Sequence, residues 1–221
     1  MARPKAAGFD AQRAAIRDAA TRLFADKGYA SASVADIAAA CGVSKALLYH
    51  YYGAKEDLLY DIAISYVQRL QAIVADVTAQ ALPPPAQLRQ LIARFMHEYE
   101  HSAARHRVLV QDVKYLSRAH RSQVVACERA VVAAFAAAIA PLAPGAGDAW
   151  HKPLAMILFG MINWTFTWLR DDGTLRHEEL APVIADLYLG GIGRVRAAVP
   201  AQRAPGRAAA RMKATGMKAA T

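Results

Sequence analysis

The sequence predicts an all-α protein, with a small N-terminal helical domain followed by a larger C-terminal helical bundle. Alanine, the strongest helix former, is abundant throughout the 221 residues. Glycine and proline lie mostly between segments whose apolar residues recur at helical spacing. Runs of β-branched residues are few. A chain of this length can bury one medium core or two small ones.

The first helix is predicted over residues 10–27. Its apolar residues form a single stripe, and Gly28 is placed to end it. Residues 1–8 are expected to be a flexible basic arm, which contains Arg3 and Lys5.

Two short helices joined by a tight turn are predicted next. Ser33 suits an N-cap position, and Asp36 lies three residues later as the carboxylate of a capping box. Gly42 lies where a left-handed turn residue is needed, and Ser44 can cap the second helix. The outer face of that second helix carries Lys45, Ala46, Leu47, Tyr49 and His50. This pattern is typical of a helix-turn-helix whose second helix reads the major groove of DNA.

The segments DAATRLFADKGYASAS and SVADIAAACGVSKALLYHYYGAKEDLL closely resemble the DNA-binding region of TetR-family bacterial transcriptional regulators. The resemblance is dense from about Ile16 to Leu59 and beyond that is one of size and helical character. The sequence departs from the common pattern at Ala46, Leu47 and Tyr52. The resemblance implies a DNA-binding head, an effector pocket in the bundle behind it, and a ligand-responsive regulator.

Groove chemistry and the resemblance together assign roles toward DNA. Lys45 and His50 can donate to base edges or phosphates, while Ala46 and Leu47 can touch thymine methyl groups. The hydroxyl of Tyr49 can reach phosphate. Lys55 resembles the phosphate-contacting lysine of the family, and helix N-termini favour anions there. The expected DNA-binding residues are Ser33, Ser44, Lys45, Ala46, Leu47, Tyr49, His50 and Lys55.

A long helix is predicted over residues 54–81, too long to belong to the head alone. It would connect the head to the bundle, and three prolines at 83–85 end it. The bundle helices are expected at residues 86–103, 105–116, 120–140, 150–169 and 177–195. The predicted domains are the arm 1–8, the helix-turn-helix domain 9–57, the ligand-binding and dimerisation domain 58–199, and a disordered basic tail 200–221.

The positive charge is concentrated at the two ends of the chain. Of the formal net charge of +9, the tail carries +5, and Arg3 and Lys5 carry +2, which leaves +2 for residues 6–199. Charged ends strengthen binding to phosphate without reading sequence. The two cysteines, Cys41 and Cys127, are too few for a disulfide framework, so a cytoplasmic location is expected.

A ligand pocket is predicted among the large side chains of the bundle. The candidate ligand-binding residues are Phe95, Tyr99, Asp112, Tyr115, Leu116, Asn163, Trp164, Thr167 and Trp168. This composition suits a mainly apolar or aromatic ligand, although the aromatic residues could instead simply fill the core. The segments DVKYL and GMINWTFTWLRDDGTL resemble parts of family members that sense acyl-CoA thioesters, which implies an acyl-CoA or an aromatic acid as the first candidate effector.

The last two helices are expected to form a homodimer interface, with helix 120–140 as the alternative. Residues 153–169 are too apolar for burial on one side only, and two helices from each subunit would make a four-helix interface. This uncharged run has 17 residues, the short edge of a membrane span. We expect it to be buried in protein, with no membrane partner.

Two other functions remain open at the level of sequence. His97, Glu98 and His101 match the zinc-protease string HExxH, but no third ligand follows and no strand is predicted to align a substrate. We therefore expect no metal, no cofactor and no catalysis. The second alternative is a constitutive DNA-binding protein whose solid bundle serves only dimerisation.

Overall fold

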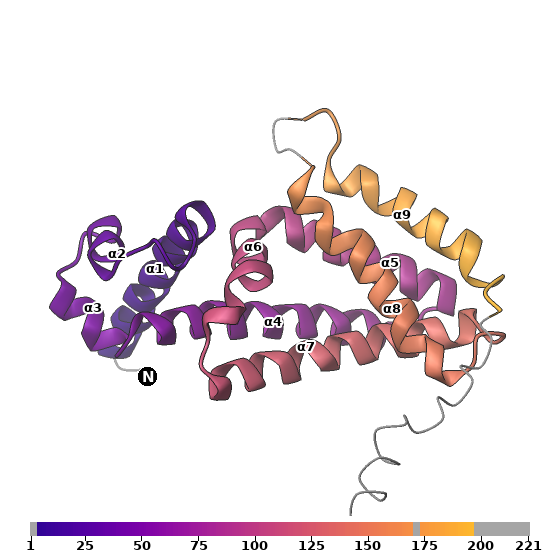
Figure 1. The fold of residues 1–221 in the computed structure, drawn as a ribbon, viewed down its shortest axis with the longest axis horizontal. Helices are drawn as coiled ribbons and strands as arrows, with labels where there is room; N and C mark the ends of the chain where they lie inside the picture. The colour runs from indigo at the N-terminus through magenta and orange to yellow at the C-terminus, as the bar shows by residue number, and fades with distance from the viewer. Residues whose placement is uncertain (1–3, 170–172, 197–221) are drawn as a thin grey trace, which may run out of the picture.

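The computed structural model describes residues 4–169 and 173–196, and within them nine α-helices and three short 3₁₀ turns but no strand. The helices α1 to α3 form a compact head at one end, and α4 carries the chain from the head into the bundle (Figure 1). The all-α fold with an N-terminal head and a C-terminal bundle is therefore confirmed. The tail 200–221 lies outside the described residues.

Helix α1, Pro4–Lys27, begins six residues earlier than the sequence predicted. Residues 4–8, expected in a flexible arm, are therefore helical. The reason is that proline suits the first turn of a helix, where its missing N–H costs nothing. Ile16 and Phe24 are buried in the core, and Gly28 ends the helix with a φ of +80°.

The helix-turn-helix consists of α2, Val34–Ala40, and α3, Lys45–Tyr51. The predicted capping box is present at Ser33. Gly42 adopts a φ of +65°, which an L side chain rarely does, and the turn closes where the N–H of Val43 donates to the carbonyl oxygen of Ala38 at 3.0 Å. Leu48 is buried and anchors α3 to the head.

Helix α4, Lys55–Ala79, has 25 residues and so spans about 37 Å. Its N-terminal part, with Leu58 and Ile62, is buried in the head, and its C-terminal part, with Ile73 and Val77, is buried in the bundle. A single helix thus belongs to both cores, as its predicted connecting role requires.

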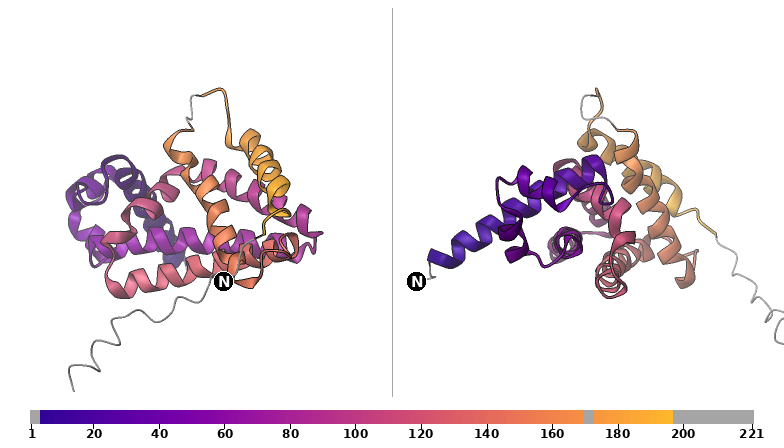
Figure 2. Two further views of the ribbon diagram at one scale, coloured as in Figure 1. Left: turned by 45° about the vertical axis from the view of Figure 1, so that its right-hand side comes forward. Right: turned by 60° about the vertical axis from the view of Figure 1, so that its left-hand side comes forward.

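The bundle contains α5, Pro84–His101; α6, Ala103–Asp112; α7, Arg118–Ile139; α8, Asp148–Asn163; and α9, His177–Ile192. Helix α7 packs along α4 and against α8, and α9 packs on α5, as the two rotated views show (Figure 2). The aromatic core joins Phe95 to Phe135 and Phe135 to Phe159, with ring centroids 4.8 and 4.7 Å apart.

All five bundle helices end before the predicted residue, and the difference is largest for α6 and α8. Helix α6 stops at Asp112 and a 3₁₀ turn follows at Val113–Tyr115, while α8 stops at Asn163 before a 3₁₀ turn at Trp164–Thr167. The hydroxyls of Thr165 and Thr167 donate to the carbonyls three residues earlier, at 2.8 and 2.7 Å. These local hydrogen bonds compete with the regular helical pattern.

By length and composition alone, Arg118–Leu142 is the one helical segment in the described part of the chain that could cross a membrane. In the structure α7, which makes up most of this segment, packs against α4, α5 and α8 of the bundle.

Candidate DNA-binding surface and ligand cavity

The outer face of α3 presents to solvent all five of its residues that are predicted to contact DNA: Lys45, Ala46, Leu47, Tyr49 and His50. Leu47 and Tyr49 are 40% and 50% exposed although both are large and hydrophobic. The oxygen of Ser44 accepts from the N–H of Leu47 at 3.1 Å, which fixes the start of the helix. The face can therefore offer a cation, an imidazole, a phenol and apolar groups to a groove.

His50 is oriented by an aromatic cluster that the sequence did not predict. The ring of Phe9 in α1 lies 4.5 Å from the ring of Tyr51 and 6.2 Å from that of His50. Because Phe9 stands next to the segment expected to be a flexible arm, nothing in the pattern pointed to this contact. The start of α1 thus supports the reading helix directly.

Ser33 and Lys55, both expected to bind DNA, have partners within the protein. The Ser33 hydroxyl donates to the Asp36 carboxylate at 2.8 Å and accepts from the backbone N–H of Asp36. The negative charge of Asp36 therefore lies beside the Ser33 hydroxyl. The Lys55 ammonium donates to the carbonyls of Tyr29 and Ala32 at 2.8 and 2.9 Å. Only one of its three donors remains for a phosphate. In this structure both side chains hold the head together.

A cavity of about 210 Å³ lies in the bundle between α4, α5, α6, α7 and α8. Its lining residues are Val67, Leu70, Tyr99, His106, Leu109, Val110, Glu128, Val131, Val132, Met156, Phe159 and Asn163. Two of the predicted ligand-binding residues, Tyr99 and Asn163, meet here, and the Tyr99 hydroxyl donates to the Asn163 side-chain oxygen at 2.6 Å. Burial raises the pKa of Tyr99, so this phenol stays protonated.

The other predicted ligand residues lie elsewhere. Phe95 is fully buried behind the cavity in the aromatic core. Of the remaining predicted ligand-binding residues, three lie near the head: Asp112, Tyr115 and Leu116. The other three follow the C-terminal end of α8: Trp164, Thr167 and Trp168. These six do not line the cavity, because α6 and α8 both end before or among them.

His106 on α6 is a cavity residue that the sequence reasoning missed. Its Nε2 lies 3.2 Å from the carbonyl oxygen of Asn163, which can only accept, so Nε2 carries the proton. Its ring stacks on Tyr99 with centroids 4.0 Å apart. Burial lowers the pKa of His106 to about 4, and the charge of His177 acts in the same direction. The imidazole is therefore neutral at physiological pH.

Helix α6 also contacts the head. Arg105, next to His106, donates to the carboxylate of Asp18 in α1 at 2.7 Å, and Arg107 donates to the carbonyl of Ala25 at 3.3 Å. At the C-terminal end of α6 and in the turn after it, the buried Asp112 carboxylate accepts from the backbone N–H of Tyr29, and the ring of Tyr115 stacks on that of Tyr29 at 5.3 Å. One short helix thus borders both the cavity and the head.

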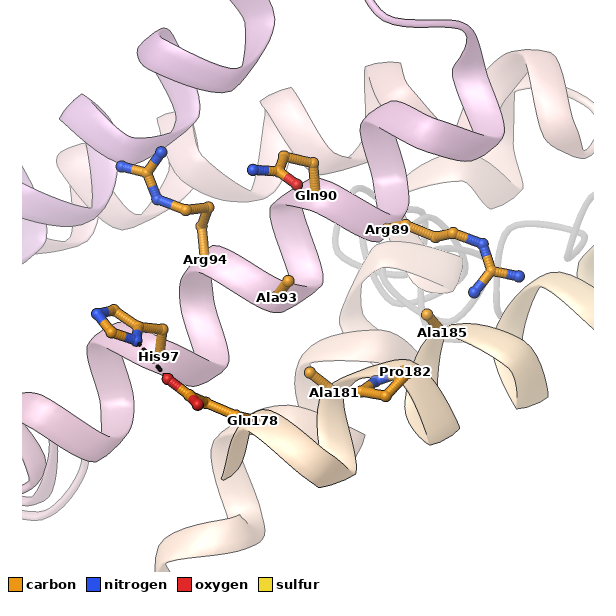
Figure 3. A pocket seen from close by; sticks show the side chains of 9 residues that line it. All are labelled: Arg89, Gln90, Ala93, Arg94, His97, Glu178, Ala181, Pro182 and Ala185. Atoms are coloured by element: carbon orange, nitrogen blue, oxygen red, sulfur yellow. Dashed lines mark hydrogen bonds and ion pairs between the residues drawn. The ribbon is translucent and has the colours of Figure 1, made fainter. Parts of the chain in front are cut away.

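The residues of the HExxH string have other partners in the described structure. Both carboxylate oxygens of Glu98 are engaged, one by Arg69 at 3.1 Å and the other by the hydroxyl of Ser102 at 2.7 Å. His97 instead pairs with Glu178 at 3.2 Å across a groove between α5 and α9 (Figure 3). Among the described residues, no group of three or more His, Cys, Asp or Glu could hold a metal ion.

An exposed apolar face runs along α8 and α9. Ile157 of α8 is 56% exposed, Trp164 in the 3₁₀ turn after α8 is 60% exposed, and Leu187 of α9 is 67% exposed. Met156 and Val183 are exposed beside them, and Gly160 is accessible on the same side of α8. Exposed apolar side chains gathered on neighbouring helices are candidates for a protein–protein interface.

Comparison with known proteins agrees with both halves of the fold. Residues 16–62 match the model of bacterial regulatory proteins of the tetR family, and residues 81–192 match that of tetracyclin repressor-like C-terminal domains. A solved TetR-family transcriptional regulator from Bordetella parapertussis is similar with a TM-score of 0.77 and 32% identity, covering 84% of this chain and 98% of that one.

Two further similar proteins have named functions. The structure of AibR in complex with isovaleryl coenzyme A and operator DNA is similar with a TM-score of 0.72 and 25% identity, covering 80% of this chain and 97% of that one. The transcriptional repressor KstR2 of Rhodococcus jostii is 28% identical over 109 residues, which are 49% of this chain and 53% of the repressor. The chain spans about half the length of the first curated relatives that it matches.

Proposed function

Because the chain belongs to the TetR family of bacterial regulatory proteins, we propose that it is a cytoplasmic, ligand-responsive transcriptional regulator. It acts as a homodimeric repressor that binds a palindromic operator and leaves it when a small effector enters the bundle. The observation that carries this proposal is the outer face of α3, where Lys45, Leu47, Tyr49 and His50 are exposed together on a helix fixed by caps at its start.

The exposed apolar face of α8 and α9 supports dimerisation through these two helices. A single head reads too few base pairs for a tight and specific site, so two heads on successive major grooves are needed. Covering Ile157, Trp164 and Leu187 by the same residues of a second subunit would bury this face around a two-fold axis.

The cavity supports a small effector with a mainly apolar body. Its 210 Å³ corresponds to about seven water molecules, enough for a short acyl chain or a single aromatic ring. Because AibR binds isovaleryl coenzyme A, an acyl-CoA remains one candidate class. Its coenzyme A moiety would have to stay outside a cavity of this size. The presence of such a cavity favours a regulator that responds to an effector over a constitutive DNA-binding protein with a solid bundle.

We expect the signal to pass through α6. His106 and Val110 border the cavity, while Arg105 and Arg107 on the same helix hold α1 of the head. An effector that displaces α6 would therefore move the head through α1 as well as through α4. Since the half-sites are about one helical turn apart, a shift of a few ångströms would misalign the two reading helices.

This coupling predicts a measurable change in the distance between the two heads. A spin label is to be attached to a cysteine introduced by Ala39→Cys, on the exposed side of α2. The two native free cysteines are removed by Cys41→Ala and Cys127→Ala so that only this position is labelled. The label-to-label distance in the dimer is expected to change by several ångströms on saturation with an effector found by operator release. An unchanged distance with full release of DNA would contradict the mechanism.

Replacement of Lys45 tests the DNA-binding surface. The Lys45→Ala variant is expected to bind its operator about tenfold more weakly, because each subunit loses a charged donor in the groove. The measurement is a titration of operator and random duplexes at one stated salt concentration, with the operator selected from a random pool. Lys152→Ala, an exposed lysine on α8, is the control. Equal affinity of Lys45→Ala and the parent for the operator would count against the surface.

A further inference from the structure

Among the described residues that line the cavity of the bundle, one side chain is formally charged, Glu128 of α7. The other residues that line it are aliphatic, aromatic or neutral, and His106 is among the neutral ones. Placing a lone carboxylate among such groups costs free energy unless a partner compensates for the lost water. The cost shows in the pKa of Glu128, which burial raises.

Glu128 differs from two other buried acids of the bundle, Glu98 and Asp112. The Glu98 carboxylate is engaged by Arg69 and Ser102, and Asp112 accepts from the backbone N–H of Tyr29. For Glu128, the described residues supply no hydrogen bond or ion pair, and Arg121 acts on it only by longer-range attraction. The structure therefore holds an acceptor at the cavity wall without a donor.

A second group in the same cavity wall, the side chain of His106, also has an acceptor without a hydrogen-bond donor among the described residues. His106 uses its Nε2 proton on the carbonyl of Asn163, so its Nδ1 is an acceptor, and this buried atom has no partner in the described structure. The Glu128 carboxylate and the Nδ1 of His106 are thus two acceptors in one cavity wall, and both call for a hydrogen-bond donor, the carboxylate for a positively charged one.

We propose that the effector is a small organic cation, a protonated amine on a mainly apolar body, whose ammonium group pairs with the carboxylate of Glu128. The inference rests on the proposed role of this cavity as the effector site and narrows the ligand to one chemical class. A carboxylate in the same position is repelled, and a neutral alcohol gains a hydrogen bond but no charge pairing.

The test is isothermal titration calorimetry of the full chain at pH 7.5 with matched probes. These are 3-phenylpropylamine, 3-phenylpropan-1-ol and 3-phenylpropanoate, which share one apolar body, together with isovaleryl coenzyme A. We expect the amine to bind at least tenfold tighter than the alcohol and the carboxylate to bind weakest. The Glu128→Gln variant keeps the shape of the side chain and is expected to lose the tenfold preference, with alcohol affinity within threefold of the parent.

Two controls keep the result interpretable. Asp148→Asn, at an exposed position at the start of α8, removes the same formal charge away from the cavity and must leave the ranking unchanged. Val132→Phe fills the cavity and must weaken the amine at least tenfold, which locates the binding there. Thermal unfolding of each variant confirms that it is folded.

Several outcomes overturn the inference. It fails if the carboxylate or isovaleryl coenzyme A binds tighter than the amine, if no probe binds, or if Glu128→Gln retains the amine preference. Operator binding of the same preparations, measured without probe, separates the two proposals. If the parent protein binds the operator specifically but shows no preference for the amine, only the ligand class is refuted. If the parent protein binds operator and random duplexes equally, the proposed function is refuted whatever the calorimetry gives.

Discussion

A Leu187→Asp variant is expected to be a folded monomer that binds a palindromic operator at least a hundredfold more weakly than the parent protein. Leu187 lies in the exposed apolar face of α8 and α9. In a two-fold interface the substitution occurs twice, so two carboxylates near the axis would be buried without partners. Once the subunits separate, each head binds its half-site alone and loses the high local concentration that the second head provides.

The variant is to be compared with the parent by light scattering after size-exclusion chromatography and by titration of operator and half-site duplexes. Leu175→Asp is a matched control, because Leu175 is also exposed but precedes α9 rather than lying on its outer face. The control is expected to remain dimeric. If Leu187→Asp also stays dimeric with full operator affinity, the interface lies elsewhere, and α7 becomes the candidate.

The sequence was sufficient for features that depend on neighbours along the chain. The capping box at Ser33, the left-handed turn at Gly42 and the cap at Ser44 each follow from spacings of a few residues, and the structure contains all three. The long α4 is equally local, because its apolar spacing is unbroken up to the prolines. The caps, the turn and the exposed face of α3 could therefore be predicted, whereas the early start of α1 and the contact of Phe9 with His50 could not.

Features that depend on contacts between helices could not be predicted in this way. The cavity is lined from five helices, so no local pattern marks Glu128 or His106 as members of one site. Aromatic size was a poor guide, because Phe95 fills the core and Trp168 is exposed. Lys55 shows the same limit: its place in the motif is familiar, but its ammonium lies on the carbonyls of Tyr29 and Ala32.

The free energy of unfolding is expected to fall by about 3 kcal/mol as the pH is lowered from about 6.5 to 4, through His106 alone. The native state holds the pKa of this histidine at about 4, against 6.5 in the unfolded chain. Between these values the unfolded state binds a proton that the native state does not, so lowering the pH favours unfolding. Above pH 6.5 both states are neutral at this position, and the contribution is constant.

The measurement is urea denaturation of the parent and of His106→Gln at intervals from pH 4.5 to 7.5. Glutamine can still donate to the carbonyl of Asn163, but it does not titrate. As the pH falls, the free energy of unfolding of the parent is therefore expected to decrease more steeply than that of His106→Gln, by about 1.4 kcal/mol per pH unit, the value for one proton. His50→Gln, the same substitution on the exposed face of α3, is the matched control for the loss of a histidine outside the cavity. Parallel curves for the parent and His106→Gln would show that His106 is not held neutral. Because carboxylates common to both proteins cancel in the difference, the comparison isolates the one buried imidazole that faces the cavity.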